Sequence, residues 1–221
     1  MPIGGSAHPE GRAAQKKLLF AVVLVALWVP LVAGGMVFLW RYSTTAGAPG
    51  NPPTSWPRHA GLERDPNSMT LVMVVHPHCP CSRASIGELA ELMAHTQNRL
   101  QAWVMFVRPG TYADDWAKTD LWRSAAAIPG VKAIVDDGRE ARRFGAETSG
   151  ETLLYDANGK LMFAGGITGA RGHYGDNAGL TAVIDLVGKP DSIRTAKTAV
   201  YGCPLFAPSK VREEGVKSCS R

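Results

Sequence analysis

The sequence predicts a mixed α/β sheet flanked by helices and preceded by one transmembrane helix. Three observations carry this prediction. Strand-like and helix-like segments alternate through residues 66–189, an unbroken apolar run occupies residues 18–40, and an Asn-Gly turn at 158–159 separates two short apolar segments. Such alternation is typical of a sheet covered by helices, and the apolar run is long enough to cross a bilayer.

The apolar run at residues 18–40 is LLFAVVLVALWVPLVAGGMVFLW, which has no charged side chain. Pro30 and the Gly34-Gly35 pair are tolerated in a membrane helix, because neighbouring groups satisfy the backbone that they free. A cleaved signal peptide is the alternative, since Ala46-Gly47-Ala48 resembles a cleavage site. The run is longer than the apolar part of a usual signal peptide, so we expect an uncleaved single-pass anchor in the lipid bilayer.

Charge around this run predicts its orientation. Arg12, Lys16 and Lys17 precede it closely, whereas Arg41 alone follows it directly. Cytoplasmic flanks carry more cations, so we expect residues 1–17 to be a cytoplasmic tail at a bacterial inner membrane. The rest of the chain then faces the periplasm, an oxidising compartment in which disulfides persist.

Composition divides the remaining chain into three parts. Residues 41–65 are rich in Pro, Gly and Thr, which predicts an extended tether. Residues 66–189 carry the alternating elements of one domain, and residues 190–221 are expected to be an extension because their periodicity is weak. The net charge of +5 does not indicate a nucleic-acid partner, because the cations are scattered and no nucleic-acid motif accompanies them.

The residues within each segment of the domain predict whether it forms a strand or a helix. Residues 69–75 are an apolar and β-branched run that suits a buried strand. Residues 82–97 place Ile86, Leu89 and Met93 on one helix face. We predict further strands at 102–107 and 131–135, further helices at 114–128 and 138–144, a hairpin of 152–155 with 161–164, and a last helix at 177–187.

A glycine-rich loop, residues 165–177, precedes the last helix. It lacks the Gly-Lys-Ser/Thr of a phosphate-binding loop. We expect Asp176 or Asn177 to cap the helix. Arg171, His173 and Asp176 could also lie at the sheet edge near the cysteines.

A Cys-Pro-Cys motif joins the first predicted strand to its helix. A thiol at a helix N-terminus faces unpaired backbone N–H groups and the positive end of the helix dipole, and both favour the reactive thiolate. Cys79 is nearer the strand end than Cys81, so we expect it to be exposed and to be the attacking thiolate. Pro80 suits the first helical turn, and a His78 imidazolium could lower the Cys79 pKa further.

The order of these elements, with cysteines between the first strand and its helix, resembles the thioredoxin fold over residues 66–189. The segments HPHCPCSRAS, TSGETLLYDANGKLMFAGGITGARGHYGDNAG and YGCPL resemble bacterial membrane-anchored thioredoxin-like proteins of the RedB type. The resemblance implies thiol–disulfide exchange with a thiol or disulfide protein partner, and it implies no nucleotide or flavin cofactor.

The chain departs from the usual thioredoxin pattern at two positions. Aligning Arg83 with the basic residue that commonly follows the second cysteine puts Ser82 in that cysteine's place. Ser149 stands where thioredoxins carry a cis-proline whose neighbouring backbone pairs with substrate strands. This replacement puts docking by backbone pairing in question.

Two cysteines are candidates for resolving an intermediate on Cys79. Helix residues two apart point away from each other, so a bridge between Cys79 and Cys81 would be strained and labile. Cys203 is the distant candidate, and Cys219 is either a free thiol or the partner of Cys203. The sequence leaves the choice between Cys81 and Cys203 open.

Two other functions stay open. His76, His78, Cys79 and Cys81 are ligand types that suit copper or zinc, although their adjacent spacing is cramped for a tetrahedral site. A periplasmic metallochaperone would use such a set on the same fold. A non-catalytic interaction module would instead hold its cysteines in a static bridge.

Overall fold

The computed structural model describes residues 9–97, 99–189 and 195–206. The chain divides into two compact units, Met1–Thr44 and Thr45–Arg221. The first unit contains helix α1 (Pro9–Thr44), with Pro30 inside it. The stretch Ala14–Thr44 is long enough to span a bilayer, and an 18-residue window within it has a mean hydropathy of 2.5, a property that a membrane anchor and a signal sequence share. The apolar N-terminal helix is therefore consistent with either.

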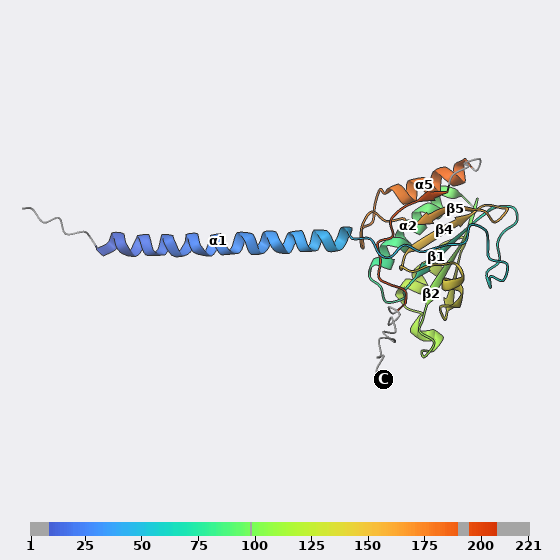
Figure 1. Ribbon diagram of the computed structural model, residues 1–221, viewed down its shortest axis with the longest axis horizontal. Coiled ribbons are helices and arrows are strands. Elements are labelled where there is room, and N and C mark those ends of the chain that lie inside the picture. Colours follow the sequence, from blue (N-terminus) through green and yellow to red (C-terminus); the bar gives the residue numbers. More distant parts are fainter. Residues whose placement is uncertain (1–8, 98, 190–194, 207–221) are drawn as a thin grey trace, which may run out of the picture. The chain divides into compact units, whose positions relative to one another are not determined.

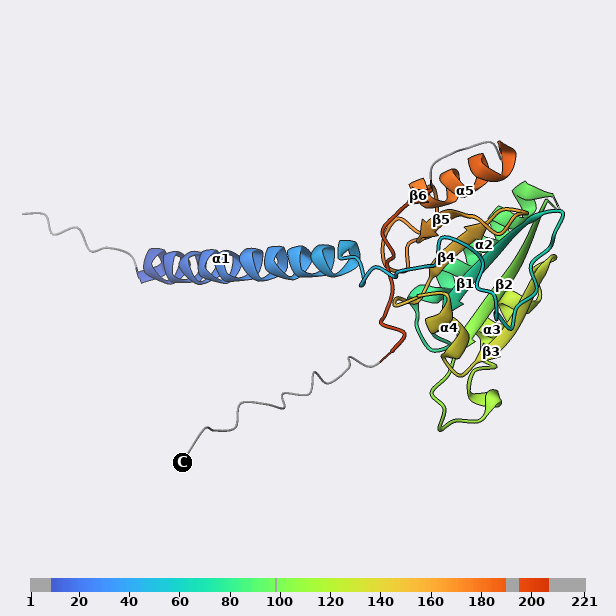
Figure 2. The ribbon, with the colours of Figure 1, turned by 45° about the vertical axis from the view of Figure 1, so that its right-hand side comes forward.

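The second unit is built on one six-stranded sheet with the order β3-β2-β1-β4-β5-β6 (Figures 1 and 2). Strands β1 to β3 are parallel to one another, β4 runs antiparallel to β1, and β5 runs antiparallel to β4. All seven residues of the central strand β1 are buried, as expected for a strand covered on both faces. The strands are β1 (Met69–Val75), β2 (Leu100–Val107), β3 (Val131–Asp136), β4 (Glu151–Tyr155), β5 (Leu161–Gly165) and β6 (Ala196–Lys197).

The two faces of the sheet are covered differently. One face packs against α2 (Cys81–Thr96), α3 (Asp120–Ala126) and α5 (Ala178–Gly188), which together with the strands form the larger apolar cluster. The other face packs against the short helix α4 (Arg139–Arg143) and against extended chain that precedes β1. The predicted mixed sheet with flanking helices is confirmed.

One predicted helix, at residues 114–128, is divided in the structure. It forms a 3₁₀ turn, η1 (Asp114–Trp116), and then α3, with Thr119 in an extended conformation before α3. The Thr119 hydroxyl donates a hydrogen bond to the Pro77 carbonyl oxygen (3.2 Å). Trp116 packs against the rings of His76 and His78. Contacts with the loop after β1 therefore interrupt the helix at this point.

The segment that was expected to be an extended tether joins the second unit from Thr45 onward. Trp56 lies edge-on to Phe144 and Tyr155, with ring centroids 5.1 and 5.2 Å apart. Leu62 is 4% exposed and belongs to the same apolar cluster. The extended chain packs here because the short helix α4 leaves much of this face to be covered.

Candidate active site

The cysteine motif lies in the turn between β1 and α2. The Cys79 N–H donates to the His76 carbonyl oxygen (3.1 Å), and the Ser82 N–H donates to the Cys79 carbonyl oxygen (3.0 Å). Pro80 takes the N-cap position of α2 with helical backbone angles, where its missing N–H costs nothing. The helix starts at Cys81, one residue earlier than predicted.

A second cysteine reaches this turn from the far end of the chain. The Sγ atoms of Cys79 and Cys203 lie 3.2 Å apart. The Ser149 N–H donates to the Cys203 carbonyl oxygen (2.8 Å), and the Leu205 N–H donates to the Glu147 carbonyl oxygen (2.9 Å). We call residues 200–205 the strap; it runs as an antiparallel strand-like segment beside residues 147–149. Cys219 lies outside the described residues.

The Cys-Pro-Cys motif is less exposed than predicted, because the strap lies against it. Cys79 is only 2% exposed, so the prediction of an exposed Cys79 is wrong. Cys203 is half-buried and Cys81 is 7% exposed. Cys79 does lie just past the end of β1, but the strap lies beside it and places the Cys203 sulfur against the Cys79 sulfur.

The pKa of the Cys79 thiol lies below its ordinary value of 9.0. Burial by itself raises this pKa. Hydrogen bonds from the Cys203 side chain and backbone, the Ser82 hydroxyl and the Cys81 backbone outweigh that effect, because they stabilise the thiolate. Cys79 is therefore the thiol of this group that ionises most readily.

The two neighbouring thiols are shifted in the opposite direction. Burial, a hydrogen bond to Cys79 and the Cys79 charge raise the pKa of Cys203 to about 12. Burial, followed by the charge of Cys79 and a hydrogen bond to it, raises the pKa of Cys81. The Arg171 guanidinium acts against both shifts. The arrangement therefore favours ionisation of Cys79 over ionisation of its two neighbouring thiols.

Ser82 and Ser149, which we expected at the positions of a thioredoxin cysteine and cis-proline, contact each other. Their hydroxyl oxygens lie 2.8 Å apart, and the Ser149 Oγ also accepts from the His76 N–H (2.8 Å). The pair joins the end of β1 to the start of α2 and to the loop before β4. The Ser149 backbone does pair with an extended segment, but that segment is the chain's own strap.

Arg171 connects the glycine-rich loop to the site. Its guanidinium donates to the Gly202 carbonyl oxygen in the strap. His173 and Asp176, by contrast, lie close enough to the buried Glu88 of α2 to affect its pKa. The expected cap of the last helix is confirmed at Asn177, whose side chain accepts the Leu180 N–H (2.8 Å).

The two histidines of the motif contact Trp116. The His78 Nε2 lies 3.1 Å from the Trp116 carbonyl oxygen, and the His76 Nδ1 accepts the His78 N–H (3.2 Å). Burial, and then the nearby His78, lower the pKa of His76, which favours a neutral ring. Within the part of the chain that the structure describes, no group of three or more His, Cys, Asp or Glu side chains has a geometry that could hold a metal ion.

Arg83, the other supporting residue predicted, lies on the exposed side of α2. It forms an ion pair with Asp120 at the start of α3. The side chains of this pair are 64% and 57% exposed. Their contribution is therefore to the contact between the two helices, and a small one, because exposed ion pairs are screened by water.

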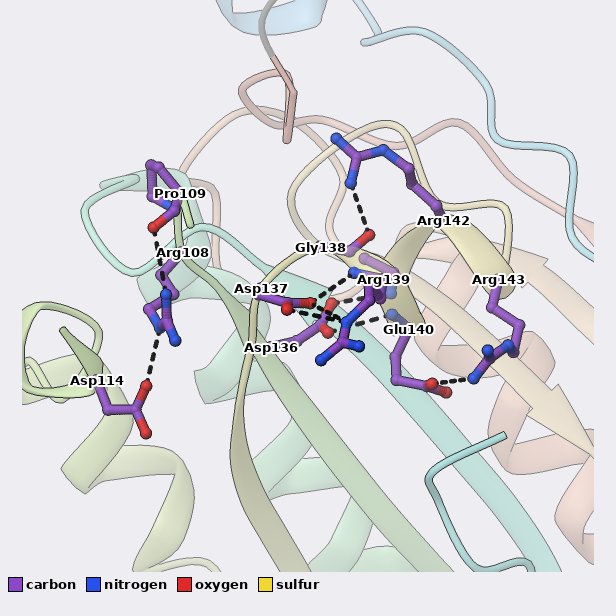
Figure 3. A network of polar contacts seen from close by, with 11 residues as sticks. Arg108, Pro109, Asp114, Asp136, Asp137, Gly138, Arg139, Glu140, Arg142 and Arg143 are labelled. Atoms are coloured by element: carbon purple, nitrogen blue, oxygen red, sulfur yellow. Dashed lines mark hydrogen bonds and ion pairs between the residues drawn. The ribbon is translucent and has the colours of Figure 1, made fainter. Parts of the chain in front are cut away.

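A cluster of charged side chains lies at the carboxyl ends of β2 and β3 (Figure 3). The Asp136 carboxylate accepts the N–H groups of Glu140 and Ala141 (3.1 and 2.9 Å) and so caps α4. Arg108 forms an ion pair with Asp114 (2.8 Å) across the same cluster. The charged groups in this cluster contact one another or backbone groups, and these contacts hold the turn structure at this end of the sheet.

The sequence did not predict that backbone pairing of the strap with residues 147–149 would hold Cys203 beside Cys79. Gly202 lies so close to Ser149 that a Cβ atom would overlap the Ser149 carbonyl oxygen. Glu147 supplies the second strand-like hydrogen bond. The only local signal is the short segment YGCPL, whose periodicity is too weak to predict a strand.

No protein-family model and no curated protein matches the chain. Among solved structures, a hypothetical protein from Sinorhizobium meliloti 1021 is 17% identical, with a TM-score of 0.50 over 74% of this chain and 96% of that one. A thioredoxin-like protein from Aeropyrum pernix is 13% identical, with a TM-score of 0.39 over 71% and 98%.

A third match is an exposed lipoprotein thioredoxin from Streptococcus pneumoniae strain TIGR4, which is 15% identical with a TM-score of 0.40 over 56% and 85%. Identities this low speak to the fold alone. The central strand that leads into the cysteine turn, its parallel neighbour, the antiparallel hairpin and the last helix form a thioredoxin-like fold.

Proposed function

We propose that this protein is a membrane-tethered thiol–disulfide oxidoreductase of the RedB type, with Cys79 as nucleophile and Cys203 as resolving cysteine. The observation that carries the proposal is the 3.2 Å separation of the Cys79 and Cys203 sulfurs. The apolar helix α1 would hold the domain at the periplasmic side of a bacterial inner membrane. The partner would be a protein that offers a thiol or a disulfide.

In the direction that reduces a partner, the Cys79 thiolate attacks one sulfur of the partner's disulfide. A bond forms between Cys79 and that sulfur, the partner's own bond breaks, and the other partner sulfur leaves as a thiolate. The lowered pKa of Cys79 supports its role as the attacking group, since the thiolate is the nucleophile.

The mixed disulfide is then resolved by Cys203. Once Cys79 is bonded to the partner, its negative charge is gone, and with it one cause of the raised Cys203 pKa, whereas Arg171 remains nearby. The Cys203 proton passes to the partner thiolate released first. Cys203 attacks the Cys79 sulfur, the Cys79–Cys203 disulfide forms, and the second partner sulfur leaves. Two electrons have then moved to the partner, and the reverse sequence oxidises it.

Cys81 and Ser82 support the thiolate in this proposal. The Cys81 side chain makes a hydrogen bond with Cys79, and the Ser82 hydroxyl makes another. Thiol chemistry is favoured over copper or zinc carriage because the Cys79 sulfur is engaged by Cys203 and both imidazoles lie against Trp116. Ser149 would position the turn through its contacts with His76 and Ser82.

Trapping tests the proposal. The full-length Cys203→Ser variant, expressed in a bacterial membrane, should accumulate mixed disulfides at Cys79 that mass spectrometry identifies. The matched Cys81→Ser variant should not accumulate them, because its resolving cysteine is intact. Adding Cys79→Ser to Cys203→Ser should abolish them. Equal trapping by the Cys81→Ser variant, or adducts that persist without Cys79, would contradict the assignment.

A further inference from the structure

The strap lies against the cysteine turn. Its backbone pairs with residues 147–149 through two hydrogen bonds, and its Cys203 sulfur lies 3.2 Å from Cys79. An extended chain running antiparallel along this edge therefore delivers a sulfur atom to Cys79. The same geometry would serve a partner's cysteine, but the edge is already filled by this chain.

The strap is anchored at its two ends by buried side chains. Val200 and Leu205 are buried, with 6% and 7% exposure, and the Gly47 N–H donates to the Val200 carbonyl oxygen (2.8 Å). Between these ends Tyr201 and Cys203 are half-buried and Pro204 is exposed.

The central attachment of the strap is polar. Arg171 donates to the Gly202 carbonyl oxygen, and the absence of a side chain at Gly202 allows close approach to Ser149. A segment held by a few backbone hydrogen bonds and two buried side chains opens far more readily than the sheet beneath it.

Access to Cys79 requires such an opening. The residue is 2% exposed, and thiol–disulfide exchange needs the attacking sulfur to meet the partner's sulfur directly. Cys203 now takes the place next to Cys79 where the partner's sulfur must arrive. A partner disulfide therefore reaches Cys79 only after the strap has moved.

We propose that the strap is a displaceable internal occupant of the edge at residues 147–149, which a partner's extended, cysteine-bearing segment replaces during exchange. This inference rests on the proposed function. The partner segment pairs with the same backbone groups while its sulfur bonds to Cys79. Return of the strap brings Cys203 back to the Cys79 sulfur, so resolution of the mixed disulfide and expulsion of the partner segment are one event. The resulting Cys79–Cys203 bond then closes the edge covalently.

The test measures how readily Cys79 reacts when the strap is loosened. Full-length protein in detergent, with Cys81→Ser, Cys203→Ser and Cys219→Ser, keeps Cys79 as its only cysteine and keeps every backbone contact of the strap. In this background Leu205→Ala should raise the rate of Cys79 alkylation by iodoacetamide at least about tenfold. The matched control is Leu161→Ala, which removes a similarly buried leucine from the same apolar cluster, but from β5.

Two results would overturn the inference. The Leu205→Ala rate could equal the parent rate, or Leu161→Ala could raise the rate equally, which would indicate general loosening of the domain. Gly202→Ala provides a second variant, because its added Cβ would overlap the Ser149 carbonyl oxygen and should displace the strap without shortening any side chain of the apolar cluster.

A synthetic peptide, AVYGSPLF, corresponds to residues 199–206 with serine at the cysteine position. It should slow alkylation of the Gly202→Ala variant by refilling the edge, and a peptide of the same composition in scrambled order should not. No protection by AVYGSPLF would also count against the inference. The proposed function fails separately, by the absence of Cys79-dependent mixed disulfides in the Cys203→Ser protein.

Discussion

Two peripheral segments of the second unit differ in what they contribute. Residues 45–65 and residues 195–206 both have weak periodicity, and both pack on the sheet. The first segment contributes Trp56 and Leu62 to an apolar cluster. The second brings Cys203 to Cys79. Segments that look alike in composition can therefore serve stability in one place and chemistry in another.

The physical difference lies in how each segment is held. Trp56 makes two edge-on ring contacts, and its burial removes a large apolar area from water. The strap is held by a few backbone hydrogen bonds, by the close approach that Gly202 permits and by the buried side chains of Val200 and Leu205. Apolar packing favours a permanent attachment, whereas a few backbone hydrogen bonds allow exchange with another chain.

The largest expected effect tests whether residues 195–206 serve the chemistry through Cys203. Cys203→Ser should lower the steady-state rate of disulfide exchange by about a hundredfold, because the mixed disulfide loses its nearby resolving thiol. The free energy of unfolding should change by less than about 0.5 kcal/mol, since serine keeps the size and the backbone contacts. Turnover of a model protein disulfide and denaturant unfolding measure the two effects. An unchanged turnover would remove Cys203 from the mechanism.

The next largest effect tests whether residues 45–65 serve stability through Trp56. Trp56→Ala should lower the free energy of unfolding by about 2 kcal/mol, because a half-buried tryptophan loses its contacts with Phe144 and Tyr155. The rate of Cys79 alkylation in the native protein should stay the same. Urea unfolding and alkylation kinetics on the same preparation check this pair of outcomes. A faster alkylation rate would indicate that residues 45–65 also control the site.

The pH dependence of alkylation sharpens the comparison further. Because the Cys79 pKa is lowered, the thiolate fraction and the alkylation rate should reach half their maximum below pH 9.0. Cys203→Ala removes the thiol that stabilises the Cys79 thiolate, so the midpoint should move to higher pH. Trp56→Ala is the control, and its midpoint should match that of the parent protein. A midpoint that stays in place after Cys203→Ala would contradict the assigned cause.

The smallest expected effect concerns the serine that pairs with the turn. Ser149→Ala removes the acceptor of the His76 N–H and the partner of the Ser82 hydroxyl. We expect a loss of about 1 kcal/mol in the free energy of unfolding. Ser124→Ala, at an exposed position of α3, should change it by less than about 0.5 kcal/mol. Equal losses in the two variants would show that the Ser149 contacts contribute nothing.

Local sequence was sufficient for much of the fold. The apolar run of β1, the amphipathic pattern of α2 and the Asn-Gly hairpin each depend on residues within one short window. The cap at Asn177 was predictable for the same reason. The division of the predicted helix at 114–128 was not, because it results from contacts with the loop that follows β1.

Some features of the candidate site were likewise predictable from local sequence, and others were not. The cysteine turn and its position at a helix N-terminus follow from neighbouring residues, and Arg171 was a candidate through the loop before α5. The exposure of Cys79 was predicted wrongly because the covering strap is distant in sequence. The choice between Cys81 and Cys203 also stayed open in the sequence.

The sequence by itself determined the apolar N-terminal helix, the alternating elements of the sheet and a thiol at the start of α2, since these depend on residue order over one element. Only the tertiary structure brings the distant Cys203 thiol beside Cys79. Cys79 and Cys203 are 124 residues apart in the chain. Their contact depends on the backbone pairing of the strap with residues 147–149, and backbone groups are alike in every residue, so no side-chain pattern records that pairing.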